Sequence, residues 1–251
     1  MIYFIGIGPG DPELLTIKAL KYIRKADYAI YVSGVYVENI LGYLPADCKK
    51  LLIKDFPISS QVAFSKSHPD SVIVRFHTGD LSLESGCRDL IDSLRAEGIP
   101  FSCVPGISAV SALASRIGVD YLLDGVSNSF TVVLPSDNRL VPLGQNVGCV
   151  AKFGGAVAVL GINPDNIGLV EKELSAGGKD KHSLICLASR VSQEDEKIII
   201  TRLDKAEKIM KKYKIGRFTM LLAGDFLESI SLYTGNMLLD FWKREGVFVE
   251  I

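Results

Sequence analysis

The residues that decide the fold are IYFIGIGPGDP at positions 2–12, a short apolar run that leads into a glycine-rich turn. The run Ile2–Ile5 is typical of a buried strand, and after the turn Asp11 and Pro12 suit the N-cap and first position of a helix. We expect this helix to continue to about Lys25. A strand, a tight turn and a helix in this order form the first unit of an α/β fold.

The same unit recurs through the first half of the chain. Further strands are predicted at 28–32, 71–76 and 101–104. A helical stretch ends at Gly98, and Ser108 is placed to cap a short helix that ends at Gly118. Repeated strand–turn–helix units indicate a parallel sheet covered by helices.

A second series of elements follows Gly118. Its strands are predicted at 129–134, 156–160, 183–187, 197–201 and 218–222. The stretch 135–155 is rich in Gly, Pro and Asn and is predicted to be a loop, whereas Asn163 begins a helix. We therefore predict two α/β lobes, 1–122 and 123–251, joined near 120–128.

Composition excludes several function classes. With 251 residues, 48% of them hydrophobic, and a formal net charge of −1, the chain can fill its cores and has no broad basic field for nucleic acid or an anionic membrane. The five cysteines form no CxxC pair and have no histidine at metal-ligand spacing, which predicts reduced thiols and no metal site. No apolar run is long enough to span a membrane. These features predict a cytoplasmic protein, and any acidic ligand would have to be met by local cations.

Three polar turns stand directly after predicted strands: Gly6–Asp11, Thr78–Asp80 and Pro105–Ser108. Ligands of open α/β sheets bind at the carboxyl ends of the strands, although each turn by itself also suits simple chain reversal. A nicotinamide dinucleotide site would need a third glycine where Asp11 stands and an acidic residue where Ser33 stands. A nicotinamide-dependent oxidoreductase is therefore disfavoured.

Five segments carry a family resemblance, in order and over nearly the full length: FIGIGPGDPELLT (4–16), RFHTGD (75–80), VPGISA (104–109), DEKI (195–198) and TMLLAG (219–224). They resemble the motifs of the tetrapyrrole (corrin and porphyrin) methylases. The second and the last segment look most similar to the precorrin-4 C11-methyltransferases of that family.

The resemblance implies two α/β lobes with S-adenosylmethionine in the cleft between them, usually in a homodimer. It also implies C-methylation of a tetrapyrrole in cobalamin biosynthesis, with precorrin-4 or cobalt-precorrin-4 at C11 as the first expectation. Carried over position by position, the cofactor would be bound by Pro9, Thr78, Gly79, Asp80, Leu83, Ser108, Ala109, Leu160 and Ala188. Asp80 would pair with the methionine ammonium or a ribose hydroxyl, and Gly106 would allow a close backbone approach to the cofactor.

The substrate side is expected to depend on positioning, because the reduced macrocycle already offers a nucleophilic carbon. If a proton must leave afterwards, His77 has a suitable ordinary pKa of about 6.5. Four cations are candidates for the carboxylates of the macrocycle: Arg75, Arg139, Lys152 and Arg190.

Three positions depart from the family pattern, namely Ser33, Leu81 and Pro135, and they keep two alternatives open. One is a methylase that acts on precorrin-2, uroporphyrinogen III or a non-tetrapyrrole acceptor. The other is a non-catalytic paralogue that binds the cofactor or a tetrapyrrole as a sensor.

Overall fold

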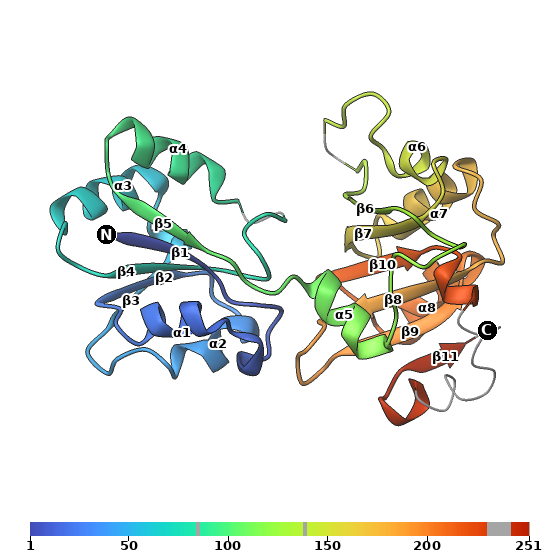
Figure 1. Cartoon of the computed structure of the whole chain (residues 1–251), viewed down its shortest axis with the longest axis horizontal. Coiled ribbons are helices and arrows are strands. Elements are labelled where there is room, and N and C mark those ends of the chain that lie inside the picture. Colours follow the sequence, from blue (N-terminus) through green and yellow to red (C-terminus); the bar gives the residue numbers. More distant parts are fainter. Residues whose placement is uncertain (84–85, 138–139, 230–241, 251) are drawn as a thin grey trace. The chain divides into compact units, whose positions relative to one another are not determined.

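A computed structural model of the chain describes residues 1–83, 86–137, 140–229 and 242–250. The chain forms two compact units, Met1–Ala112 and Leu113–Ile251 (Figure 1). Both are α/β units built on one sheet each, as the sequence predicted. No helix among the described residues is long and apolar enough to cross a membrane.

The first unit has a five-stranded parallel sheet in the order β3-β2-β4-β1-β5. Its strands are β1 (Ile2–Gly6), β2 (Tyr28–Tyr31), β3 (Lys49–Leu52), β4 (Ile73–His77) and β5 (Phe101–Val104). Helices α1 (Ile17–Ile23) and α2 (Val35–Leu41) pack on one face, and α3 (Ile58–Ser67) and α4 (Arg88–Ala96) on the other (Figure 1). Because both faces are covered, β1 is apolar nearly throughout, and all of β4 is buried, including Arg75 and His77.

The single helix predicted from Asp11 to Lys25 is wrong, because two caps divide this segment. Asp11 accepts a hydrogen bond from the Glu13 amide at 2.8 Å and starts only a 3-10 turn, Pro12–Leu14. Thr16 is extended, and its hydroxyl accepts from the Ala19 amide at 3.1 Å to begin α1. A threonine N-cap therefore overrides the helical continuation.

The second unit has a six-stranded mixed sheet in the order β11-β9-β8-β10-β7-β6. Its strands are β6 (Phe130–Val133), β7 (Ala156–Ile162), β8 (Leu184–Ser189), β9 (Lys197–Arg202), β10 (Thr219–Ala223) and β11 (Phe248–Glu250). Among the described strands of this sheet, only β6 with β7 and β9 with β11 pair in parallel. Each edge of the second sheet therefore carries both beginnings and ends of strands, whereas all strands of the first sheet end at the same edge.

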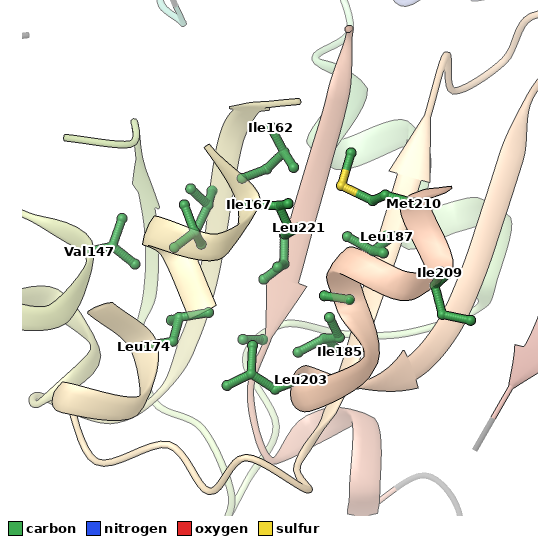
Figure 2. Close-up of a cluster of buried hydrophobic side chains, with 14 of the residues drawn as sticks. Val147, Ile162, Ile167, Leu174, Ile185, Leu187, Leu203, Ile209, Met210 and Leu221 are labelled. Atoms are coloured by element: carbon green, nitrogen blue, oxygen red, sulfur yellow. The ribbon is translucent and has the colours of Figure 1, made fainter. Parts of the chain in front are cut away.

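One face of the second sheet is covered by α6 (Val147–Ala151), α7 (Ile167–Ala176) and α8 (Ala206–Lys212). Figure 2 shows the apolar side chains of these helices meeting those of the strands. The helix α6 lies within the stretch that was predicted to be loop, so that prediction is wrong there. Asn146 caps it by accepting from the Cys149 amide at 2.7 Å, and its five residues are too few to show helical periodicity.

The division between the units falls inside α5 (Ala109–Ile117), earlier than the boundary between 122 and 123 that the sequence suggested. The end of α5 is anchored in the second unit. Arg116 forms an ion pair with Glu196 at 2.8 Å, and the Ile117 carbonyl accepts from Trp242 Nε1 at 2.8 Å. Contacts made by the end of α5 thus assign it to the second unit. The local composition of the sequence does not reveal this boundary.

Candidate functional site

Three loops meet at the carboxyl edge of the first sheet, because they follow the neighbouring strands β4, β1 and β5. Gly8 and Gly79 pair through two backbone hydrogen bonds, Gly79 N to Gly8 O at 2.7 Å and Gly8 N to Gly79 O at 3.2 Å. The third loop is tied in by Asp80, whose carboxylate accepts from the Gly106 amide at 3.0 Å. The predicted cofactor residues of this unit are thereby brought together.

The backbones of these loops touch at glycines. A Cβ on Gly106 would lie 2.2 Å from the Gly79 carbonyl oxygen and 2.6 Å from the Gly6 carbonyl oxygen. A Cβ on Gly6 would in turn lie 2.5 Å from the Gly106 amide nitrogen. The expectation that Gly106 makes room for the cofactor is therefore corrected: the other two loops occupy the space that a side chain would need.

Asp80 organises the site through its carboxylate. Besides Gly106 N it accepts from the Ser82 amide at 2.9 Å and from the Ser82 hydroxyl. Burial acts to raise the pKa of Asp80, but the hydrogen bonds from Ser82, Gly106 and Leu81 together outweigh it and hold the pKa below its usual range. The carboxylate is thus charged at neutral pH and engaged in joining two loops, while its predicted bond to the cofactor stays a prediction.

The Cβ position of Gly79 is nearly unobstructed. A Cβ on Gly79 would meet only the Cα of Ser108, at 4.0 Å. Thr78 is exposed, Leu83, Ser108 and Ala109 are half-buried, and Pro9 is buried. Hydroxyls, turn amides and a fixed carboxylate around a space of this kind fit the amino-acid and ribose groups of S-adenosylmethionine.

His77, the candidate base, ends β4 and is 6% exposed. Its Nε2 lies 2.5 Å from Nη1 of Arg75, which is equally buried and whose Nε donates to Gln61 Oε1 at 3.0 Å. Because a guanidinium only donates, His77 Nε2 must be the acceptor and carries no proton. Arg75 was a candidate for binding substrate carboxylates, but it is an interior residue that orients the histidine. Its burial lowers its pKa.

The second unit brings its two predicted cofactor residues to either side of Met220. Ala188 of β8 pairs with Met220 of β10 and is fully buried. On the other side of Met220 lies β7, whose pairing with β10 shifts in register so that Leu160 and Gly161 together lie opposite Met220. Gly161 has a φ of 74°. This β-bulge redirects the half-buried Leu160. Met220 and the bulge were missed, although a glycine within a strand signals a bulge.

The remaining candidates are dispersed. Lys152 is exposed, Arg190 pairs with Asp195 at 2.6 Å, and Arg139 lies outside the described residues. Within the described ranges no group of three or more His, Cys, Asp or Glu side chains is placed to hold a metal ion.

Comparison with known proteins identifies the family. Residues 1–207 match the family model described as Tetrapyrrole (Corrin/Porphyrin) Methylases. The chain is 30% identical to the cobalt-precorrin-4 C(11)-methyltransferase of Methanocaldococcus jannaschii over 98% of each chain, and 24% identical to that of Priestia megaterium over 89% of this chain and 87% of the relative.

Solved structures agree on the fold. The X-ray structure of a cobalt precorrin-4 methyltransferase superposes with a TM-score of 0.86 at 24% identity, covering 90% of this chain and 95% of that one. A uroporphyrin-III C-methyl transferase from Thermus thermophilus, complexed with S-adenosylhomocysteine, superposes with a TM-score of 0.72 at 24% identity, covering 91% and 99%. The chain therefore belongs to the tetrapyrrole methylases, a family of methyltransferases that use S-adenosylmethionine.

Proposed function

We propose that this protein methylates a carbon of a cobalamin-pathway tetrapyrrole, with C11 of precorrin-4 or of its cobalt form as the first choice. The observation that carries the proposal is the identity of 30% with the Methanocaldococcus enzyme over 98% of both chains. A homodimer in the cytoplasm is proposed on the ground of the same family resemblance.

We propose that the loops of the first unit hold the methyl donor. S-adenosylmethionine supplies an electrophilic methyl group on sulfur. Thr78, Gly79 and Ser108 are proposed to bind it at the open side of the Gly79 turn, next to Pro9, Leu83 and Ala109. Asp80 fixes the shape of that turn and offers its remaining lone pairs. In the second unit, Leu160 and Ala188 are proposed to contribute apolar contacts to the adenine.

The chain's own contribution to rate is then alignment of the acceptor carbon with the methyl group, which is worth effective molarities of about 10⁵ M in favourable cases. His77 is proposed to take up the proton that leaves the methylated carbon. Because Nε2 accepts from Arg75, the neutral ring carries its proton on Nδ1, and the ring would accept a further proton at Nε2 only after a local shift releases that nitrogen from Arg75. We therefore expect His77→Ala to slow turnover only modestly.

The test is incubation of the protein with a reconstituted precorrin-4 pool and S-adenosylmethionine labelled in its methyl group, followed by mass spectrometry and carbon-resolved NMR. Label on C11 supports the first choice. Label on another ring carbon assigns the protein to a sister reaction on precorrin-2 or uroporphyrinogen III. No transfer, together with calorimetric binding of S-adenosylhomocysteine, overturns the catalytic proposal in favour of a sensor.

A further inference from the structure

A pocket of about 320 Å³ lies at one edge of the second sheet, where β8 ends and β9 and β10 begin. Its lining includes four cationic side chains and one carboxylate: Arg190, Lys197, Lys214, Arg217 and Asp195. Asp195 and Lys197 belong to the family segment 195–198, whereas Arg190, Lys214 and Arg217 lie outside the family segments. The positive charge is concentrated locally, since the chain as a whole has a net charge of −1. The lining is suited to an anion.

Two of the cations are held in place by the pocket's own structure. Arg190 forms an ion pair with Asp195 at 2.6 Å, and Lys197 Nζ donates to the Tyr213 carbonyl at 2.9 Å. Within the described part of the chain, no carboxylate forms an ion pair with Lys197, Lys214 or Arg217. The charges of Arg190 and Asp195 neutralise each other, so the positive charges of Lys197, Lys214 and Arg217 remain to attract a ligand.

The backbone around the pocket is unusual as well. Among the described residues, four that are not glycine have a left-handed φ: Arg190, Ser192, Lys214 and Phe218. Three of these line the pocket. Backbone strain of this kind gathers at functional sites, where the gain in function offsets it.

Lys214 is the clearest case of a residue that is strained by its backbone conformation and lines the pocket. It follows the end of α8, where Ile215 N donates to Met210 O at 2.9 Å and closes a Schellman-type cap. Glycine is preferred at this position because a side chain is strained there, and Lys214 has a φ of 51°. A lysine is therefore present at a position where glycine would give a more stable cap, and this lysine lines the pocket.

We propose that this pocket is a subsite for the carboxylate arms of the ligand, which in the proposed function, on which this inference rests, are the acetate and propionate side chains of the tetrapyrrole. Its volume of about 320 Å³ is at the lower end of the range of roughly 300–1,000 Å³ for small-molecule sites, so it accepts one or two arms and excludes the whole macrocycle. Phe218, 65% exposed at the rim, offers an apolar surface to the methylene groups. Because Thr219 pairs with Ile162, the pocket shares its sheet edge with the Leu160–Gly161 bulge.

The decisive variant is Lys214→Gly in the full-length protein, because stability and binding should change in opposite directions. The melting temperature should equal or exceed that of the wild type, since the cap becomes favourable. The dissociation constant for uroporphyrin, an octacarboxylate whose fluorescence reports binding, should rise about fivefold through the loss of one charge. In the double variant with Arg217→Gln, the dissociation constant should be about tenfold or more above that of the wild type. Raised salt should reduce this difference in affinity between the double variant and the wild type.

Lys208→Gln is the matched control, because Lys208 is an exposed cation of α8 that does not line the pocket. It should bind uroporphyrin like the wild type. Wild-type affinity in the double variant, or an equal loss in the control, would overturn the proposal. Titration with citrate separates the sources of the carboxylate: if the double variant loses citrate binding but keeps uroporphyrin binding, the pocket serves a free polycarboxylate and the assignment to tetrapyrrole arms is wrong. A wild type that binds uroporphyrin through these cations yet transfers no methyl label would leave the subsite standing and remove only the proposed reaction.

Discussion

The two sheet edges of this protein are built in opposite ways. At the first edge, Gly6, Gly79 and Gly106 bring three loops into direct backbone contact, and a carboxylate joins two of them. At the second edge, long cationic side chains stand on a backbone with several left-handed residues. The topology is the cause: in a parallel sheet all carboxyl ends share an edge, so that loops crowd together, whereas the second sheet mixes strand beginnings and ends.

The difference predicts how each edge responds to substitution. An edge made of backbone contacts has no side chain that can move aside, so one methyl group there disturbs the fold. An edge made of flexible side chains can lose a group and change its ligand affinity while the fold persists.

The largest effect is expected from Gly106→Ala. Its new methyl would clash with the Gly79 carbonyl, which lies 2.2 Å from the Cβ position, and with Gly6. Because neighbouring backbone must shift, we expect a loss of about 3 kcal/mol or more in the stability of the first unit. Hydrogen exchange resolved by peptide, over 1–12 and 73–108, measures this unit separately from the other.

The matched control for this change is Gly216→Ala at the second edge, where a Cβ meets nothing within 4 Å. It should leave exchange within error of the wild type. Equal protection of the first unit in Gly106→Ala and wild type would refute the interlocked-backbone description of the first edge.

Asp80→Ala comes next in size. The family resemblance implied a role for Asp80 in cofactor binding, and the carboxylate also accepts hydrogen bonds from Ser82 and Gly106 within the fold. We therefore expect a stability loss of about 1.5–3 kcal/mol together with weaker binding of S-adenosylhomocysteine. Urea unfolding and calorimetry measure the two effects. Asp11→Ala, which removes a carboxylate that accepts from Glu13 N, should have the smaller effect of about 1 kcal/mol.

The effect of Asp80 should also depend on pH. Hydrogen bonds hold the pKa of Asp80 below its unfolded value of about 3.9, so the charged form stabilises the fold above that pH. The contribution is lost as the pH falls through the lower, folded-state pKa. The stability difference between wild type and Asp80→Ala should accordingly be constant from neutral pH down to about pH 5 and shrink in stronger acid. A difference that grows in acid would contradict this assignment.

The sequence predicted the three polar turns and every described strand except β3 and β11, because apolar runs and Gly-Pro punctuation are local signals. The two missed strands are short and lie at sheet edges. It did not predict why Gly106 is glycine. The reason is the carbonyl of Gly79, which is remote in sequence and adjacent only once β4, β1 and β5 are paired. The Arg75–His77 contact escaped for a related reason: both residues lie within one strand, but their burial depends on α3, which supplies Gln61.

In the second unit, the cationic pocket was not predicted, because its residues come together only in the folded sheet. Lys197 stands in the family segment 195–198, but Lys214 and Arg217 lie outside every motif, and no local pattern distinguishes them from surface cations. Only the pairing of β8 with both β9 and β10 collects them.

Gly161→Ala tests the second edge with the same single methyl group. No atom lies within 4 Å of the Cβ position, so the expected loss of about 1 kcal/mol arises from the φ of 74° alone. A relaxed bulge would also turn Leu160, which should weaken S-adenosylhomocysteine binding. Gly168→Ala, within α7 and without close neighbours, should instead stabilise the second unit slightly. A Gly161→Ala loss as large as that of Gly106→Ala would remove the contrast between the edges.

The smallest effect is expected from Ser82→Ala, which separates backbone from side-chain contributions within the first edge. The variant removes the hydroxyl bond to Asp80 but keeps the backbone bonds, among them those from Ser82 N at 2.9 Å and Gly106 N at 3.0 Å. Ser82 is exposed, so water can replace the hydroxyl, and the loss should be only about 0.5 kcal/mol. If backbone contacts define this edge, affinity for S-adenosylhomocysteine should stay within about twofold of the wild type, because a change of that size corresponds to about 0.4 kcal/mol. A tenfold loss in calorimetry would show instead that the side chain of Ser82 holds the Asp80 carboxylate in its binding geometry, and the first edge would then resemble the second.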